Sequence, residues 1–214
     1  MRDEHDYSIL GHSRAVVGRY LGAVAAACSS ASVLAAGLGI ELAKQLGFGK
    51  WLPPIVVWPV TAGVVWAALH WVFTNHAWKW PGIASVIKIP DLSGEWRVSG
   101  RTLDDQKNTT YEWSGDIVIT QNWERLKVRL KTKQSASFSI SAALHCEPGA
   151  GYRLTYSYMN EPNADERDLH QHVGFADLLF ARDLKSADGD YFNNKGRTTQ
   201  GVMHLQRLEQ KNAA

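Results

Sequence analysis

Charged side chains are missing from one long stretch of this 214-residue chain. Residues 51–78 contain no Asp, Glu, Lys or Arg, although these residues make up 21% of the whole sequence. Roughly 20 apolar residues in a helix cross a bilayer core about 30 Å thick, so a buried helix of a soluble protein is the weaker explanation. The absence of charge predicts a membrane span over about residues 53–76.

Cysteine is also scarce, with two residues in the chain, Cys28 and Cys146. Two cysteines do not make a disulfide framework, and a reduced cytosolic setting is compatible with them. The first 20 residues lack the short apolar core and the small-residue cleavage site of a signal peptide.

A strong excess of basic residues is missing too. From residue 91 onward, 16 Lys and Arg face 17 Asp and Glu, so this part is close to neutral. A domain that binds long nucleic acid usually carries a basic surface. The composition therefore excludes long nucleic acid as the expected partner.

Catalytic signatures are absent from the sequence. It contains no Gly-x-Ser-x-Gly, no phosphate-binding glycine loop and no His-Glu-x-x-His, so we predict no enzyme and no catalytic residue. Two histidines, at positions 170 and 172, share one face of an expected strand, but no third ligand stands at a defined spacing; the remaining candidates are His145, Cys146 and His204. We predict no metal and no cofactor.

A second uncharged run covers residues 20–40 and is rich in Gly, Ala and Ser. Small residues let helices approach closely in a membrane, and here they recur at four-residue spacing as Gly18, Gly22 and Ala26 and again as Ala31, Ala35 and Gly39. With the short linker 41–50, the two spans predict a transmembrane hairpin over residues 16–80. One small-residue face is available for the second span and the other for a neighbouring protomer, in a homo-oligomer surrounded by membrane lipid.

The flanking charges predict the orientation of the hairpin. Lys44 and Lys50 lie in the linker, whereas more basic residues lie on the side of the termini: Arg2, Arg14, Arg19, Lys79 and Lys88. The positive-inside rule then places both termini of this multi-pass protein in the cytoplasm. Residues 1–15 are read as a cytoplasmic N-terminus.

After a connector at residues 81–90, the hydrophobic period changes to two residues, which is typical of half-buried strands. We expect strands near 92–100, 111–119, 125–131, 135–144, 152–158, 170–181, 189–192 and 201–206, separated by turn signals at 104–105, 122, 148–149, 162–163, 187–189 and 193–196. Closing such a meander removes its exposed edges. Residues 91–208 therefore predict an all-β domain, an antiparallel up-and-down β-barrel of about eight strands, lipocalin-like, with room for one small ligand.

The order of these elements, two spans followed by LSGEW, a Tyr-x-Trp-x-Gly strand, YRLTYSYMNEP, HQHVGF and GDYFNNKGRTTQG, resembles the two-transmembrane, β-strand-rich effectors of bacterial CBASS anti-phage systems. The resemblance covers about residues 20–208. It implies that the barrel binds a cyclic di- or oligonucleotide made by a cognate nucleotidyltransferase. It also implies that the protein oligomerises and that the hairpins disrupt the inner membrane, which kills the infected cell.

A cyclic dinucleotide needs aromatic faces for its bases and cations or hydroxyls for its phosphates. On this resemblance, the preferred phosphate contacts are Arg197, Thr198 and Thr199, which follow a flexible turn at the barrel rim. The other candidate ligand-binding residues lie near expected strand ends: Trp96, Arg101, Tyr111, Trp113, Tyr156, Tyr158, Asn160 and Tyr191. Aromatic residues at alternate strand positions are also typical of a core, which is the competing interpretation for Trp96 and Trp113.

Two further alternatives stay open at this point. The basic residues on one face of the strand at 125–131 and just beyond it, which are Arg125, Lys127, Arg129, Lys131 and Lys133, suit either phosphate and anionic lipid or a solvated outer face. The whole protein could also be a membrane-anchored, lipocalin-like carrier of a small hydrophobic ligand.

Overall fold

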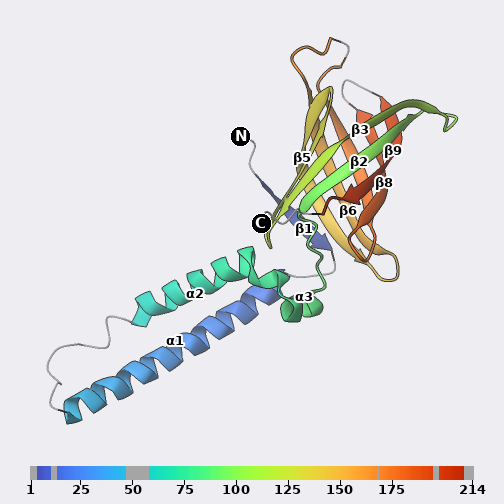
Figure 1. Ribbon diagram of the computed structural model, residues 1–214. Coiled ribbons are helices and arrows are strands. Elements are labelled where there is room, and N and C mark those ends of the chain that lie inside the picture. Colours follow the sequence, from blue (N-terminus) through green and yellow to red (C-terminus); the bar gives the residue numbers. More distant parts are fainter. Residues whose placement is uncertain (1–3, 11–13, 47–57, 168, 195–197, 210–214) are drawn as a thin grey trace. The chain divides into compact units, whose positions relative to one another are not determined.

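The chain forms two compact units in the computed structural model, which describes residues 4–10, 14–46, 58–167, 169–194 and 198–209. One unit is helical and covers Ser13–Trp80. The other unit is a β-domain that combines Met1–His12 with Pro81–Ala214. The helical unit is therefore inserted in the sequence between the first strand of the β-domain and the rest of it (Figure 1).

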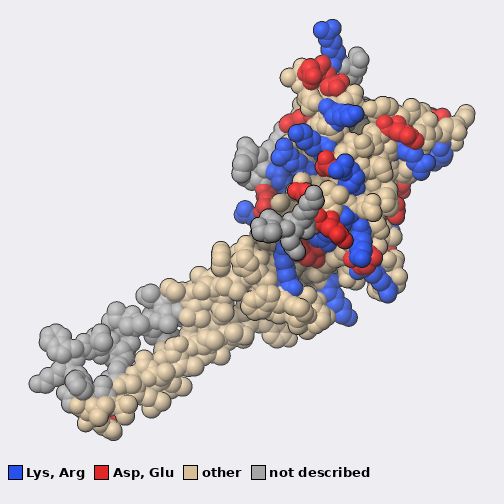
Figure 2. All heavy atoms as spheres, in the orientation of Figure 1, with Lys and Arg blue, Asp and Glu red and all other residues tan. Residues whose placement is uncertain are grey.

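The helical unit contains α1 (Arg14–Gln45), α2 (Trp58–Asn75) and a short 3-10 helix, η2 (Ala77–Lys79). Helices α1 and α2 lie side by side (Figure 1). In the described part of the chain, one segment is long and apolar enough to cross a membrane, Arg14–Gly39 of α1, and the helical unit is almost free of charge in Figure 2. Part of the expected second span lies outside the described residues, and its crossing of the membrane stays a prediction.

Two small residues of α1 are buried within the helical unit. Among the α1 side chains whose burial is described, Ala25 and Ser29 are buried, at 5% and 3% exposure. Gly22 is half-buried, and both ends of the second stripe, Ala31 and Gly39, are exposed. Most of the surface of α1 is therefore open to lipid or to another chain.

The β-domain is a closed barrel of nine described strands. The eight expected strands are present, as β2 (Gly94–Leu103), β3 (Thr109–Gln121), β4 (Arg125–Thr132), β5 (Ser135–Glu147), β6 (Gly151–Pro162), β7 (His172–Phe180), β8 (Ser186–Asn194) and β9 (Thr199–Arg207). Neighbours in sequence pair antiparallel from β2 to β9, and β9 pairs back with β2. A short helix, α3 (Pro81–Ile87), precedes β2.

The ninth strand, β1 (His5–Leu10), was not predicted from the sequence. It pairs antiparallel with β4 and parallel with β5, and so completes the barrel wall between them. Part of the segment read as a cytoplasmic N-terminus is thus a strand of the β-domain. A strand of six residues is too short for its alternating pattern to be recognised in the sequence. Its two partner strands are also more than 100 residues away in the sequence.

One expected turn is wrong. Residues 187–189 lie inside β8, and the chain instead turns at Ala181–Lys185, where the Leu184 N–H donates to the Ala181 carbonyl. Gly189 is needed within the strand because a Cβ there would come within 2.0 Å of the Asp177 carbonyl oxygen. Close approach of two strands, rather than a turn, explains this glycine.

One half of the barrel interior is solidly packed. Inward-facing side chains with at most 2% exposure fill it: Leu92, Trp96, Val98, Ile117, Ile119, Leu126, Val128, Leu144, Leu154, Leu178, Phe180 and Leu205. The Trp96 indole is fully buried, donates to the Leu92 carbonyl at 3.2 Å and meets the Phe180 ring edge-on at 5.0 Å. Trp96 is therefore part of the core.

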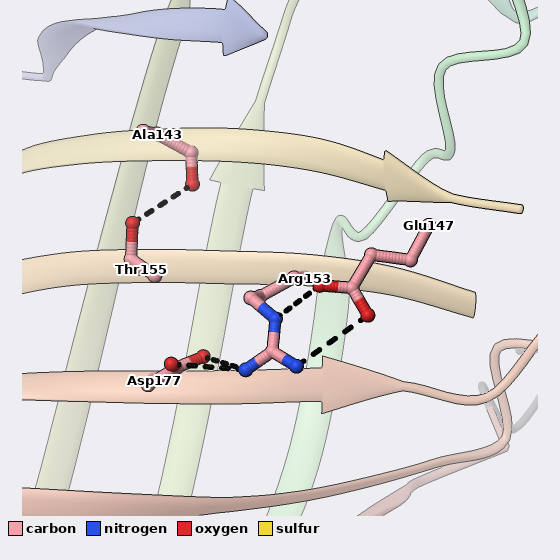
Figure 3. A network of polar contacts seen from close by, with 5 residues as sticks. All are labelled: Ala143, Glu147, Arg153, Thr155 and Asp177. Carbon is pink, nitrogen blue, oxygen red and sulfur yellow. Dashed lines mark hydrogen bonds and ion pairs between the residues drawn. The ribbon is translucent and has the colours of Figure 1, made fainter. Parts of the chain in front are cut away.

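A charged network on the outer face ties three strands together (Figure 3). Arg153 of β6 donates from Nη1 to both carboxylate oxygens of Asp177 on β7, at 2.9 and 3.0 Å, and from Nε to Glu147 of β5. The hydrogen bond from Arg153 holds the pKa of Glu147 below its usual range. Such partly exposed pairs add little stability, but they favour the observed register of β5, β6 and β7.

We expect Trp96→Ala to lower the free energy of unfolding of the barrel by about 3–5 kcal/mol, because it leaves a large cavity in the packed half. Val118→Ala is the matched control, since Val118 lies on the outer face and is 39% exposed. Chemical denaturation of the full chain in detergent, followed by β-sheet circular dichroism, measures both. A Trp96→Ala protein as stable as the control would contradict this account of the core.

Candidate functional site

The other half of the barrel interior contains a cavity of about 990 Å³. Its walls come from inward-facing positions of seven strands, β2 to β6, β8 and β9, with His172 of β7 beside them. Loop residues between strands, Lys133, Gln134 and Leu169, border it as well. The same alternation that packs one half of the barrel thus leaves a ligand-sized space in the other.

Three aromatic side chains of the cavity wall each lie against a glycine on the neighbouring strand. Trp113 is the register partner of Gly100, Tyr158 of Gly174, and Tyr191 of Gly201. A Cβ at these glycines would lie 2.2 Å from the Trp113 ring, 2.4 Å from the Tyr158 ring and 2.8 Å from the Tyr191 ring. The glycines let the rings lie back against the sheet, which keeps the space between them open.

Hydrogen bonds fix two of these rings in place. The Tyr191 hydroxyl accepts from Trp113 Nε1 at 3.0 Å and shares a 2.8 Å hydrogen bond with the Thr102 hydroxyl. The Trp113 and Tyr191 rings meet edge-on with their centroids 5.6 Å apart. A ligand in the cavity would therefore meet aromatic rings whose orientation is already set.

A second chain of hydrogen bonds joins β6, β8 and β9 at the cavity wall. Tyr158 donates its hydroxyl to Asn193 Oδ1 at 2.8 Å, and Asn193 Nδ2 donates to the Thr199 hydroxyl at 2.8 Å. Tyr158 and Asn193 are each 9% exposed. This wall is polar but its side chains are already partnered.

Two cavity side chains keep hydrogen-bonding groups open within the described part of the chain. Asn160 is 7% exposed, and its Nδ2 has no partner there. The Tyr156 hydroxyl makes no hydrogen bond there either, and burial raises its pKa, so it keeps its proton and can donate. A buried polar group without a partner is costly, so Asn160 Nδ2 points to a polar ligand, and the Tyr156 hydroxyl offers that ligand a second donor.

The structure brings together most of the residues singled out from the sequence. Those that line or border the cavity are Arg101, Tyr111, Trp113, Tyr156, Tyr158, Asn160, Tyr191 and Thr199. Arg101 and Tyr111 occupy exposed positions on their strands. Thr198 is exposed and does not line the cavity, Trp96 lies in the packed half, and Arg197 lies outside the described residues.

Sequence reasoning missed several lining residues, among them Thr102, Ser135, Ser137, His172 and Asn193, all of them buried. The four alternating serines of β5 were visible as a pattern but gave no sign of which end of the barrel was hollow. His172 donates from Nδ1 to the His170 carbonyl at 2.8 Å. Among the described residues, no three His, Cys, Asp or Glu side chains come together as a metal site.

The basic residues of β4 occupy outward positions, while Leu126 and Val128 between them are buried. Lys127 and Arg129 lie over the Phe138 ring at 5.7 and 5.5 Å on the outer surface. Figure 2 shows basic and acidic side chains mixed over the visible face of the barrel. These cations are therefore separated from the cavity by the sheet itself.

Comparison with known proteins assigns both units to one family. Residues 87–207 match a family model described as the Cap15 cyclic dinucleotide receptor domain, and residues 15–79 match one described as the Cap15 TM helices. CD-NTase-associated protein 15 of Yersinia aleksiciae is 37% identical over 206 residues, which cover 96% of this chain and 98% of that protein. The chain belongs to the Cap15 family, and its resemblance to the membrane effectors of CBASS systems is confirmed.

Proposed function

We propose that the barrel of this chain binds a cyclic dinucleotide in its cavity and that binding makes the protein oligomerise and disrupt the inner membrane. The buried and unpartnered Asn160 Nδ2 in the cavity wall is the observation that carries the proposal, and the Tyr156 hydroxyl adds a second donor. The family match to a cyclic dinucleotide receptor domain supports the same class of ligand.

The cavity suits this ligand in size and in chemistry. Its volume of about 990 Å³ lies at the upper end of the range typical of small-molecule sites. Tyr and Trp rings offer stacking surfaces to two bases. Its buried polar residues offer hydrogen bonds to base edges, ribose hydroxyls and phosphates.

Phosphate recognition then depends largely on neutral donors. Within the described lining, the cationic side chains are Arg101 and Lys133, and both are exposed at the border. Ser135, Ser137 and Asn160 are the buried donors on the neighbouring strands β5 and β6. Arg197 remains a predicted phosphate contact, because it follows β8 in the sequence next to the lining residue Thr199.

An apolar carrier is the alternative, and the cavity chemistry disfavours it. A hydrophobic ligand would leave Asn160 Nδ2 without a partner and would offer none to the Tyr156 hydroxyl. A polar ligand satisfies the same groups. The cyclic dinucleotide is therefore the better match to this wall.

The proposed disruption of the membrane depends on the helical unit. Helix α1 has 32 residues, which corresponds to about 48 Å at 1.5 Å per residue, enough to cross a bilayer. We place α2 as the second span, so that both termini and the barrel lie in the cytoplasm. The exposed small residues of α1 supply surface for a neighbouring protomer.

We expect Asn160→Leu to weaken cyclic dinucleotide binding by roughly ten- to a hundredfold, because one buried hydrogen bond to a charged ligand is lost. The substitution removes an unpartnered polar group, so the fold should keep its stability. Isothermal titration of the purified full chain in detergent with a panel of cyclic dinucleotides measures the effect.

Gln206→Leu is the matched control for that titration, since Gln206 is an exposed amide on the outer face of β9. It should bind as the unchanged protein does. If the protein binds a fatty-acid probe but none of the cyclic dinucleotides, this result would favour the carrier instead.

We expect protease added to intact spheroplasts to leave the barrel uncut, because the proposed topology places it in the cytoplasm. Permeabilised spheroplasts are the control, and there the exposed loops of the barrel should be cleaved. Immunoblotting with a C-terminal tag follows the fragment. Loss of the tag in intact spheroplasts would place the barrel outside and contradict the second-messenger role.

A further inference from the structure

Strand β1 sits as a wedge between two strands that also pair with each other. Direct pairing of β4 with β5 covers Arg129 to Lys131, opposite Phe138 to Ala136. Beyond this point β1 separates them, with His5 and Asp6 opposite Leu126 and Arg125 of β4, and residues 7–10 beside residues 142–145 of β5. The seam between β4 and β5 is therefore closed directly near the cavity and through β1 further away.

The side chain of Ser139 marks the point where the three strands meet. Its hydroxyl accepts from the Val128 N–H of β4 at 2.9 Å and lies 2.6 Å from His5 Nε2 of β1. Because His5 Nδ1 faces the Asp6 carbonyl at 3.0 Å, Nδ1 carries the proton in the neutral ring and Ser139 donates to Nε2. Ser139 lies two residues along β5 from Ser137, which lines the cavity.

A second buried contact ties β1 to the segment that returns from the helices. Gln121 Nε2 donates to the Tyr7 hydroxyl and to the Pro90 carbonyl, both at 3.2 Å, and Gln121 Oε1 accepts from the Leu92 N–H at 2.8 Å. Tyr7 is 3% exposed and Gln121 is 7% exposed. One amide thus holds both parts of the β-domain that flank the helical unit in the sequence.

The seam has two ways to satisfy the same backbone groups. The edges of β4 and β5 can bond to β1, as observed, or to each other by extending the existing pairing past Arg129 and Phe138. Unpaired strand edges are costly, so an intermediate with neither pairing is disfavoured. An element with two discrete arrangements of similar bonding can act as a switch.

We infer that β1 is a releasable wedge through which cavity occupancy controls the start of α1. Leu130 and Thr132 of β4 and Ser135 and Ser137 of β5 all line the cavity. A ligand that contacts both strands stabilises their direct pairing there, so that this pairing extends past Arg129 and Phe138 and displaces β1. This inference rests on the proposed function, because it takes the cyclic dinucleotide as the ligand.

Release of β1 has a direct consequence for the helical unit. Three residues separate the end of β1 at Leu10 from the start of α1 at Arg14. A docked β1 therefore limits how far α1 can move from the barrel, at roughly 3.5 Å per residue. Once β1 is free, α1 can reach a neighbouring protomer while the barrel stays attached through the connector before β2.

A disulfide between β1 and β5 tests the wedge. In a chain with Cys28→Ala and Cys146→Ser, Ser8→Cys with Ala143→Cys places two cysteines at register partners. Neighbouring strands lie about 4.8 Å apart, within the range that a disulfide spans. The full chain is reconstituted in dye-loaded vesicles of phosphatidylethanolamine and phosphatidylglycerol, and leakage is measured with the cyclic dinucleotide that binds best in the titration.

The oxidised β1–β5 disulfide should reduce ligand-driven leakage to the ligand-free rate, and dithiothreitol should restore it. The matched control is Ser141→Cys with Ser157→Cys, which joins β5 to β6 instead. The hydroxyls of Ser141 and Ser157 lie 2.7 Å apart. The control should leak equally when oxidised and reduced. Leakage from the oxidised β1–β5 protein at the reduced rate would overturn the wedge.

A loosened wedge should have the opposite effect. His5→Ala removes one hydrogen bond of the docked strand, so half-maximal leakage should need about fivefold less ligand. Hydrogen exchange at residues 5–10 should also speed up when ligand is bound to the unchanged protein. An unaltered leakage threshold together with unaltered exchange would contradict the inference.

Failure of the wedge and failure of the proposed function are distinguishable. If no cyclic dinucleotide binds the unchanged full chain in the titration, the proposed function fails. If the ligand binds and vesicles leak, but the oxidised β1–β5 protein leaks as well, the ligand assignment stands and the wedge fails. Linkage adds a check, because a ligand that favours release should bind the oxidised β1–β5 protein more weakly.

Discussion

The backbone of a closed barrel must find a partner for both edges of every strand, and this requirement shapes the whole protein. Between β4 and β5 the requirement is met in part by β1, a strand that precedes the helical unit in the sequence. The helices are therefore inserted between two segments of one sheet rather than appended to it. Segments of the β-domain therefore flank the helical unit on both sides in the sequence.

The barrel interior has two different halves. Apolar side chains fill one half, and a cavity with polar walls occupies the other. Trp96, Phe180 and their buried neighbours pack one half of the interior. In the other half, Gly100, Gly174 and Gly201 let three aromatic rings lie back against the wall. In that cavity wall, Asn160 Nδ2 and the Tyr156 hydroxyl make no hydrogen bond within the described part of the chain.

Much of this fold follows from the sequence, and the parts that do not have physical reasons. Alternating polarity located eight strands, because each has one face toward a core. The same alternation cannot say which end of the barrel is hollow, so Trp96 and Trp113 looked alike although one packs and the other lines the cavity. The pairing of aromatics with glycines carries that information, but it needs the strand register. Strand β1 was missed because its partners are distant in sequence.

The central claim is that a cyclic dinucleotide occupies the barrel interior. Photocrosslinking tests it most directly, with an azido cyclic dinucleotide, the full chain in detergent and mapping of modified peptides by mass spectrometry. We predict crosslinks on cavity strands, at Tyr156, Tyr158 or Tyr191, and competition by unlabelled ligand. Crosslinks confined to the basic outer face of β4, around Lys127 and Arg129, would contradict the account.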